Sequence, residues 1–137
     1  MARVLIVPCG CRGQALAREL AAAGHAVRGT TRDPARTAAI AEAGGEPYVG
    51  DPDRIGTLMG ALTGVTVVCW LMGSIEIHPG RVQMLFEKLV DTPVRGVVYE
   101  GGSPEIALDA RGRWHMPVEV VAPGGDARAA VDRVLGI

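Results

Sequence analysis

The chain has 137 residues, 48% of them hydrophobic and 21% charged, which is enough to fold as one globular domain with its own buried core. Its 14 Lys and Arg residues against 15 Asp and Glu residues give a formal net charge of −1, which argues against nucleic acid as a partner. The longest apolar run, residues 65–73, is far shorter than the ~20 residues that cross a bilayer, so we expect no membrane association. Three cysteines and no secretion leader favour a cytoplasmic protein without disulfides, folded as a single domain over residues 1–137.

Short apolar runs rich in β-branched residues alternate with helical patterns along the whole chain. Residues 3–7 and 66–71 are almost continuously apolar, as expected of strands that are covered on both faces of a sheet. Asp33 and Asp53 suit helix caps, and Gly24 suits the left-handed position after a helix. In chain order, the predicted elements are strand 3–7, helix 13–23, strand 26–30, helix 34–44, strand 46–49, helix 54–62, strand 66–71, helix 79–90, strand 96–99, strand 118–121 and helix 126–135.

Six strands joined mostly by helices predict a parallel sheet with helices on both faces. We expect a three-layer, doubly wound α/β fold of the Rossmann-like type, with strand order 3-2-1-4-5-6 and a ligand crevice at the carboxyl ends of the first and fourth strands. Residues 100–117 have no convincing helical period and contain three glycines and two prolines, so we predict a loop there.

The turn after the first strand reads Pro-Cys-Gly-Cys-Arg-Gly over residues 8–13, where dinucleotide-binding domains carry G-x-G-x-x-G. Gly10 and Gly13 occupy the second and third glycine positions, which allow close approach of a pyrophosphate and close packing of helix on strand. Pro8 replaces the first glycine, and we expect Arg12 to compensate by binding the phosphates. The alternative is that these glycines only form a sharp turn in a fold that binds no ligand.

Cys9 and Cys11 form a C-x-C pair within this turn. No histidine stands at a ligand spacing from them, so we predict no metal site and interpret the pair as two small side chains in a crowded turn. The start of the helix makes Cys11 a candidate for oxidation.

The end of the second strand indicates which dinucleotide binds. NAD-binding domains carry an acidic residue there to accept hydrogen bonds from the ribose 2′-OH. This chain has Thr31 and Arg32, and a hydroxyl beside a guanidinium suits a 2′-phosphate. We therefore expect NADP in preference to NAD, the alternative being that Arg32 is a solvated surface charge.

Several segments together resemble a known family. They are G-H-A-V-R at 24–28, R-D-P at 32–34 and G-D-P-D at 50–53. The chain resembles the extended and atypical short-chain dehydrogenase/reductases, and most closely the NAD-dependent epimerase/dehydratase group, over residues 3–74 and more loosely over 94–99.

The resemblance implies a dinucleotide site along the crevice. Arg32 would meet the adenosine phosphate, and Asp51 would accept from the adenine amino group, unless Asp51 is only a turn or cap residue. The backbone around Leu71, Met72 and Gly73 would border the adenosine ribose. The pyrophosphate would lie on the turn residues Gly10, Cys11, Arg12 and Gly13.

The catalytic half of that family does not carry over. Its enzymes use Tyr-x-x-x-Lys, but the two tyrosines here, Tyr48 and Tyr99, are followed four residues later by proline and serine. The helix that should bear the pair falls in the predicted loop, and the substrate-binding region is also expected to be absent. Ser103 and His115 are the only weak catalytic candidates. His115 and its neighbour Trp114 would cover the nicotinamide side of the crevice, and the favoured alternative is that they serve packing or a subunit contact.

Three functions therefore remain open at this point. The first is a minimal NAD(P)-binding domain without the family's catalysis, associating as a homodimer through an apolar edge at residues 116–118. The second is a small NADP-dependent oxidoreductase or epimerase with a non-standard acid–base residue. The third is a degenerate fold that acts through protein contacts.

Overall fold

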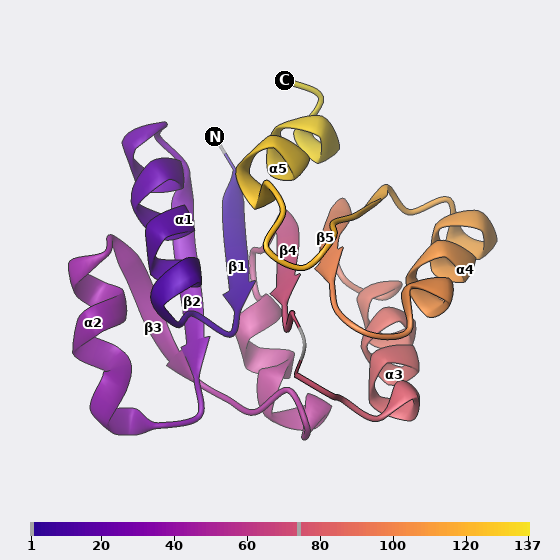
Figure 1. Ribbon diagram of the computed structural model, residues 1–137, viewed down its shortest axis with the longest axis horizontal. Coiled ribbons are helices and arrows are strands. Elements are labelled where there is room, and N and C mark those ends of the chain that lie inside the picture. The colour runs from indigo at the N-terminus through magenta and orange to yellow at the C-terminus, as the bar shows by residue number, and fades with distance from the viewer. Residues whose placement is uncertain (1, 74) are drawn as a thin grey trace.

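Six parallel strands form one sheet in the order β3-β2-β1-β4-β5-β6, and this confirms the predicted fold class and strand order (Figure 1). The computed structural model describes residues 2–73 and 75–137. The strands are β1 Arg3–Val7, β2 Ala26–Thr31, β3 Gly45–Val49, β4 Val67–Leu71, β5 Gly96–Glu100 and β6 Val118–Val120. The helices are α1 Cys11–Ala22, η1 Pro34–Arg36, α2 Thr37–Glu42, η2 Ile55–Leu62, α3 Pro79–Leu89, α4 Pro104–Trp114 and α5 Ala127–Leu135, where η1 and η2 are 3₁₀ helices.

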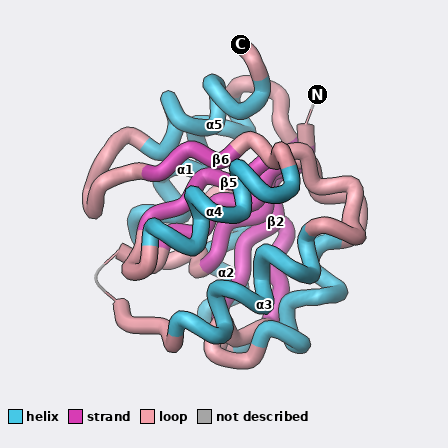
Figure 2. The backbone as a smooth tube through the Cα atoms, turned by 90° about the vertical axis from the view of Figure 1, so that its right-hand side faces the viewer, coloured by secondary structure: helices cyan, strands magenta, loops and turns pink. Residues whose placement is uncertain are grey.

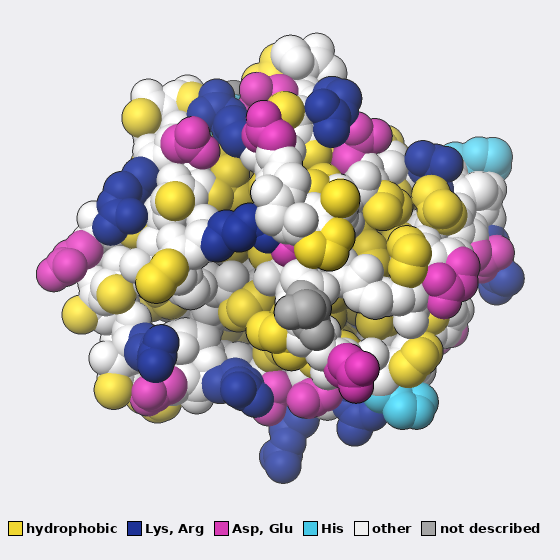
Figure 3. Space-filling view, in the orientation of Figure 1, with side chains coloured by type: hydrophobic (Ala, Val, Ile, Leu, Met, Phe, Trp, Pro, Cys, Tyr) yellow, Lys and Arg dark blue, Asp and Glu magenta, His cyan; other side chains and the backbone are white. Residues whose placement is uncertain are grey.

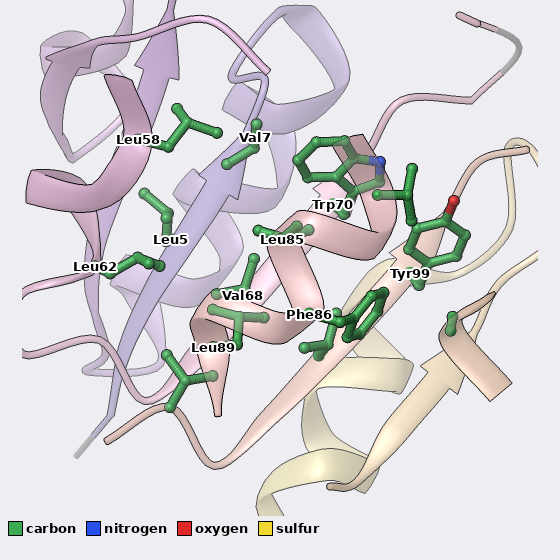
Figure 4. Packing of buried hydrophobic residues seen from close by; sticks show 14 of the residues in the cluster. Leu5, Val7, Leu58, Leu62, Val68, Trp70, Leu85, Phe86, Leu89 and Tyr99 are labelled. Atoms are coloured by element: carbon green, nitrogen blue, oxygen red, sulfur yellow. The ribbon is translucent and has the colours of Figure 1, made fainter. Parts of the chain in front are cut away.

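Both faces of the sheet are covered, which explains the continuously apolar strands. Val4 and Ile6 of β1 belong to the core beneath α1, α2 and α5, whereas Leu5 and Val7 belong to the core beneath η2, α3 and α4. Figure 4 shows the second of these cores, in which the side chains of α3 pack against strands β4 and β5. Phe86 of this core is fully buried, with its ring centroid 6.0 Å from that of Tyr99.

The prediction of a loop over residues 100–117 is wrong for the central part of that segment, because residues 104–114 form helix α4. Figure 2 shows this helix on the same side of the molecule as α3. Its buried positions are only Ala107 and Ala110, which are too small to give a clear helical period. The helix ends carry the expected signals instead, since Pro104 opens the first turn and arginines 111 and 113 occupy the last.

The capping predictions are mostly confirmed. Asp33 accepts a hydrogen bond from Ala35 N at 2.9 Å, and Gly24 has φ +93 directly after α1. Residues 55–62 form a 3₁₀ helix rather than an α-helix, and Arg54, not Asp53, occupies its cap position. None of the described helices is both long and apolar enough to cross a membrane.

Candidate functional site

A cavity of about 640 Å³ opens at the carboxyl edge of the sheet, where the strands of Figure 1 end at the bottom of the view. Its walls come from the turn between β1 and α1, the segment from the end of β2 into η1, the residues after β3, and the residues after β4. The lining residues are Pro8, Cys9, Gly10, Gln14, Thr30, Thr31, Arg32, Asp33, Pro34, Arg36, Gly50, Pro52, Asp53, Met72, Ile75 and Ile77. The predicted crevice is therefore present between β1 and β4 and extends over β2 and β3.

The glycine-rich turn presents the N-terminus of α1 to this cavity. Gly10 is the cap residue, in an extended conformation with φ −82 and ψ −158, and no described side chain caps the helix. The first turn of α1 carries no acidic residue. The helix start therefore offers unused N–H groups and a partial positive charge, which together favour an anion.

The two motif glycines have different roles. A Cβ added at Gly13 would lie 2.9 Å from the carbonyl oxygen of Pro8 and 3.0 Å from Cγ2 of Ile6, so Gly13 allows close packing of α1 on β1. A Cβ added at Gly10 would meet no described atom within 4 Å, and Gly10 lines the cavity. Protein packing therefore explains Gly13 but does not explain Gly10.

The cysteines of the turn lie in different surroundings. Cys9 is buried and packs against Gly29 of β2, and this burial raises the pKa of its thiol to about 11. Cys11 is exposed at the first position of α1 and does not line the cavity. No group of three or more His, Cys, Asp or Glu side chains suited to a metal ion occurs within residues 2–73 and 75–137.

Two arginines and two aspartates, Asp33 and Asp53, are the charged side chains that line the cavity. Arg32 and Arg36 both line it, and the guanidinium of Arg32 makes no hydrogen bond or ion pair with any residue of the described ranges. Asp33 is already engaged, since it caps Ala35 N and lies 3.7 Å from Arg36 Nε. Figure 3 shows basic side chains, with acidic ones between them, along the lower edge of the molecule where the strands end.

The two threonines at the end of β2 differ in their hydrogen bonding. Thr31 Oγ1 accepts from Asp33 N at 3.1 Å, so this hydroxyl holds the turn into η1. Thr30 is fully buried and lines the cavity, yet its Oγ1 has no partner among the described residues. A buried hydroxyl without a hydrogen bond is uncommon and costly, so Thr30 lowers the stability of the strand end beside the cavity.

The site residues predicted after β3 and β4 are only partly in the cavity. Met72 lines it, whereas Leu71 and Gly73 do not. Asp51 does not line it either, because its Oδ1 accepts from Asp53 N at 2.9 Å, which is the turn role kept as the alternative. Sequence reasoning missed Gln14, Pro52, Ile75 and Ile77, which reach the cavity from loops and from the second turn of α1.

Arg12 does not face the cavity. Its guanidinium forms an ion pair with Glu100 at the end of β5 and donates from Nη2 to the carbonyl oxygen of Gly125 at 2.8 Å. Glu100 is fully buried and also accepts from Gly124 N at 3.0 Å. The expectation that Arg12 compensates for Pro8 at the phosphates is therefore not met in this structure, because its charge is used by Glu100.

The weak catalytic candidates lie apart from the cavity. Ser103 occupies the cap position of α4 with φ +60, after β5. Trp114 and His115 lie at the amino edge of the sheet, where they line a separate cavity of about 210 Å³ with Arg95. They cannot cover a ligand at the carboxyl edge, so that interpretation is wrong. The hydroxyl of Tyr99 donates a hydrogen bond to Gly102 O. Burial raises the pKa of Tyr99 to about 12, with a smaller contribution from the negative charge of Glu105.

No protein-family model and no curated protein sequence matches the chain. Among solved structures, it is similar to a short-chain dehydrogenase/reductase superfamily protein from Agrobacterium tumefaciens with bound NAD, at 18% identity and TM-score 0.66, over 88% of this chain and 48% of that one. It is also similar to UDP-N-acetylglucosamine 4-epimerase from Bacillus cereus, at 12% identity and TM-score 0.66, over 89% of this chain and 53% of that one. A dipicolinate synthase chain from Bacillus halodurans matches at 23% identity and TM-score 0.62, over 98% of this chain and 43% of that one.

The chain has the Rossmann-like fold of these proteins. Two of these three neighbours are a short-chain dehydrogenase/reductase and an epimerase, the kinds of protein that the sequence segments resemble. The chain spans about half the length of the three structures, so their complete active sites have no assured counterpart here.

Proposed function

We propose that this chain binds a nicotinamide dinucleotide in the cavity at the carboxyl edge, with NADP preferred over NAD. The observation that carries the proposal is the open space over Gly10, at a helix start that no described side chain caps, inside a cavity that also holds two arginines. The similar protein that carries bound NAD has the same fold, which supports a dinucleotide as the ligand.

The preference for NADP rests on charge. A 2′-phosphate next to the end of β2 would meet the guanidinium groups of Arg32 and Arg36. Two acidic residues line the cavity, and both have partners: Asp33 is engaged by Ala35 N and Arg36, and Asp53 lies 3.8 Å from Arg81 Nε. Arginine at this position favours the phosphorylated ribose over the free 2′-OH.

We further propose that the chain does not perform the hydride-transfer chemistry of the short-chain dehydrogenases. Helix α4 follows β5, where those enzymes place Tyr-x-x-x-Lys, but it contains neither tyrosine nor lysine. Tyr99 stays protonated far above neutral pH and is bonded to Gly102 O, so it is unsuited to exchange protons. The sole lysine, Lys88, is on α3.

Calorimetric titration with NADP and NAD tests the ligand and the preference together. We expect NADP to bind at least about tenfold more tightly, and Arg32→Ala to remove most of that difference while leaving NAD binding unchanged. Arg133→Ala is the matched control, because Arg133 is an exposed arginine paired with Glu119, neither of which lines the cavity. Equal binding of both dinucleotides would contradict the preference, and absence of binding would contradict the proposed function.

We also propose a homodimer in the cytoplasm. The apolar edge predicted at residues 116–118 does not support a dimer interface, because Met116 and Val118 are buried within the chain. The support comes from β6, an edge strand of the sheet whose Val120 is 42% exposed. Free cysteines at 9, 11 and 69 are compatible with a reducing compartment. Light scattering at micromolar concentration tests the dimer, and a monomeric mass would contradict it.

A further inference from the structure

We propose that the cavity holds only the adenosine–phosphate end of its ligand, and that a clamp excludes the nicotinamide end. The clamp consists of Arg12, Glu100 and the backbone of Gly124 and Gly125. This inference rests on the proposed function and narrows it, since the ligand class becomes adenosine phosphates in general, with NADP one member of that class.

The position of the cavity is the first step. A doubly wound sheet has two mononucleotide-binding halves, and the half that recognises the adenosine ribose contains the end of β2. Every lining residue belongs to the turn between β1 and α1, the start of α1, the segment from the end of β2 into η1, or the segments that follow β3 and β4. None comes from β5, α4, β6 or α5. The cavity therefore serves the adenosine half of the sheet and ends before the other half begins.

The clamp closes the space where the second mononucleotide would lie. Arg12 extends from the start of α1 to Glu100 at the end of β5, and its Nη2 donates to Gly125 O at 2.8 Å. Glu100 holds the same loop through Gly124 N, which donates to Oε2 at 3.0 Å. Figure 1 shows this loop, between β6 and α5, crossing in front of β4 and β5. The helix start, β5 and this loop are thereby tied together across the second half of the crevice.

Neighbouring backbone adds to the closure. The main-chain N–H groups of Met72 and Gly73 both donate to the carbonyl oxygen of Glu100, at 3.0 and 3.3 Å. Gly73 has φ +57, and a Cβ added there would lie 3.4 Å from Glu100 Oε1. The ends of β4 and β5 are therefore joined directly beneath the clamp.

The clamp stays closed because separating Arg12 from Glu100 is energetically unfavourable. Glu100 is fully buried, and Arg12 is the only cationic side chain paired with it among the described residues. Moving Arg12 to a pyrophosphate would leave a buried carboxylate without its cation, which is strongly unfavourable. A ligand that binds by its adenosine end avoids this cost, because Arg32 and the helix start are available without breaking an ion pair.

The experiment compares NADP with adenosine 2′,5′-bisphosphate, which has the same phosphorylated adenosine and lacks the nicotinamide. We expect the two dissociation constants to agree within about threefold, nicotinamide mononucleotide not to compete, and the nicotinamide ring of bound NADPH to be quenched by iodide as in free solution. An NADP affinity more than about tenfold above that of the bisphosphate, with a ring protected from iodide, overturns the inference and leaves the proposed function standing. Absence of binding by both ligands overturns the proposed function itself.

A clamp variant gives a second, independent readout. Glu100→Gln keeps the shape of the side chain and removes the charge that holds Arg12, so we expect NADP to gain at least about fivefold over the bisphosphate. Glu119→Gln is the matched control, since it breaks the ion pair with Arg133 outside the cavity. An unchanged ratio of the two affinities in a folded Glu100→Gln chain overturns the clamp. The comparison of ligands on the unaltered chain decides the matter if that variant does not fold.

Discussion

Replacing Gly10 by alanine separates ligand binding from folding. The backbone there has φ −82, which alanine adopts freely, and the added methyl group would touch no described atom within 4 Å. Alanine restricts the unfolded chain but is a poorer cap residue than glycine, so the two effects oppose each other and we expect the free energy of unfolding to change by less than about 1 kcal/mol. The same methyl group would enter the space of a phosphate at the start of α1. Loss of one charge-assisted N–H bond costs about 1.5–3 kcal/mol, so the Kd for NADP should rise roughly 10- to 150-fold.

Two other glycines are the controls for Gly10→Ala, and unfolding curves with calorimetric titrations measure all three variants. In Gly13→Ala the methyl group is forced against Pro8 O at 2.9 Å, so we expect a loss of about 1–3 kcal/mol of stability, or roughly 3–6 °C in Tm for each kcal/mol. In Gly112→Ala the methyl group is also in open space but lies on α4, so stability should rise and binding should not change. If Gly10→Ala binds NADP as tightly as the unaltered chain, no ligand group occupies that space and the reasoning is refuted.

The remaining predictions address burial and titration. Thr30→Val removes the unpartnered hydroxyl at nearly constant volume, so unfolding should cost up to about 1 kcal/mol more; loss of stability in denaturant titrations would contradict this. Phe86→Ala should lower the free energy of unfolding by about 3–5 kcal/mol, since the ring is fully buried between α3 and β5, and a loss below 1 kcal/mol in urea unfolding would count against the packing of Figure 4. Burial raises the pKa of Tyr99 from 10.0 to about 12, so its contribution to stability is complete below pH 10 and is lost as pH rises toward 12; the tyrosinate absorbance that a Tyr99→Phe variant lacks should appear only near pH 12, and its appearance near pH 10 would refute the assignment.

The strands and their order could be predicted from sequence because the strands consist of recognisable apolar runs. Continuous apolar runs such as Val4–Val7 in β1 arise from burial on both faces, and helical connections between such runs allow few topologies. Helix α4 escaped prediction for the opposite reason. Its contact with the core is made through Ala107 and Ala110, so the pattern of large apolar residues that normally identifies a helix is absent.

Sequence correctly predicted those site residues whose position at the end of a strand is enough to bring them to the cavity. Gly10, Thr31, Arg32 and Met72 line the cavity because each is close to the carboxyl end of a parallel strand, and such ends share one edge of the sheet. Asp51 fails the same rule because its side chain is satisfied within its own turn. Local sequence cannot distinguish a carboxylate that faces a ligand from one that holds a turn.

The ion pair between Arg12 and Glu100 was the feature least predictable from sequence, and it changes the charge available to a ligand. From the turn alone, a guanidinium beside a helix start is placed for phosphate, whereas the fold brings the buried Glu100 to it from 88 residues further along the chain. With Arg12 neutralised there, the side-chain cations lining the cavity are those at the end of β2 and in η1, Arg32 and Arg36. The arginines that an anion entering the cavity can meet are therefore near the end of β2 and not near the junction of β4 and β5. The same displacement of charge that favours a 2′-phosphate thus disfavours a ligand group in the second half of the crevice.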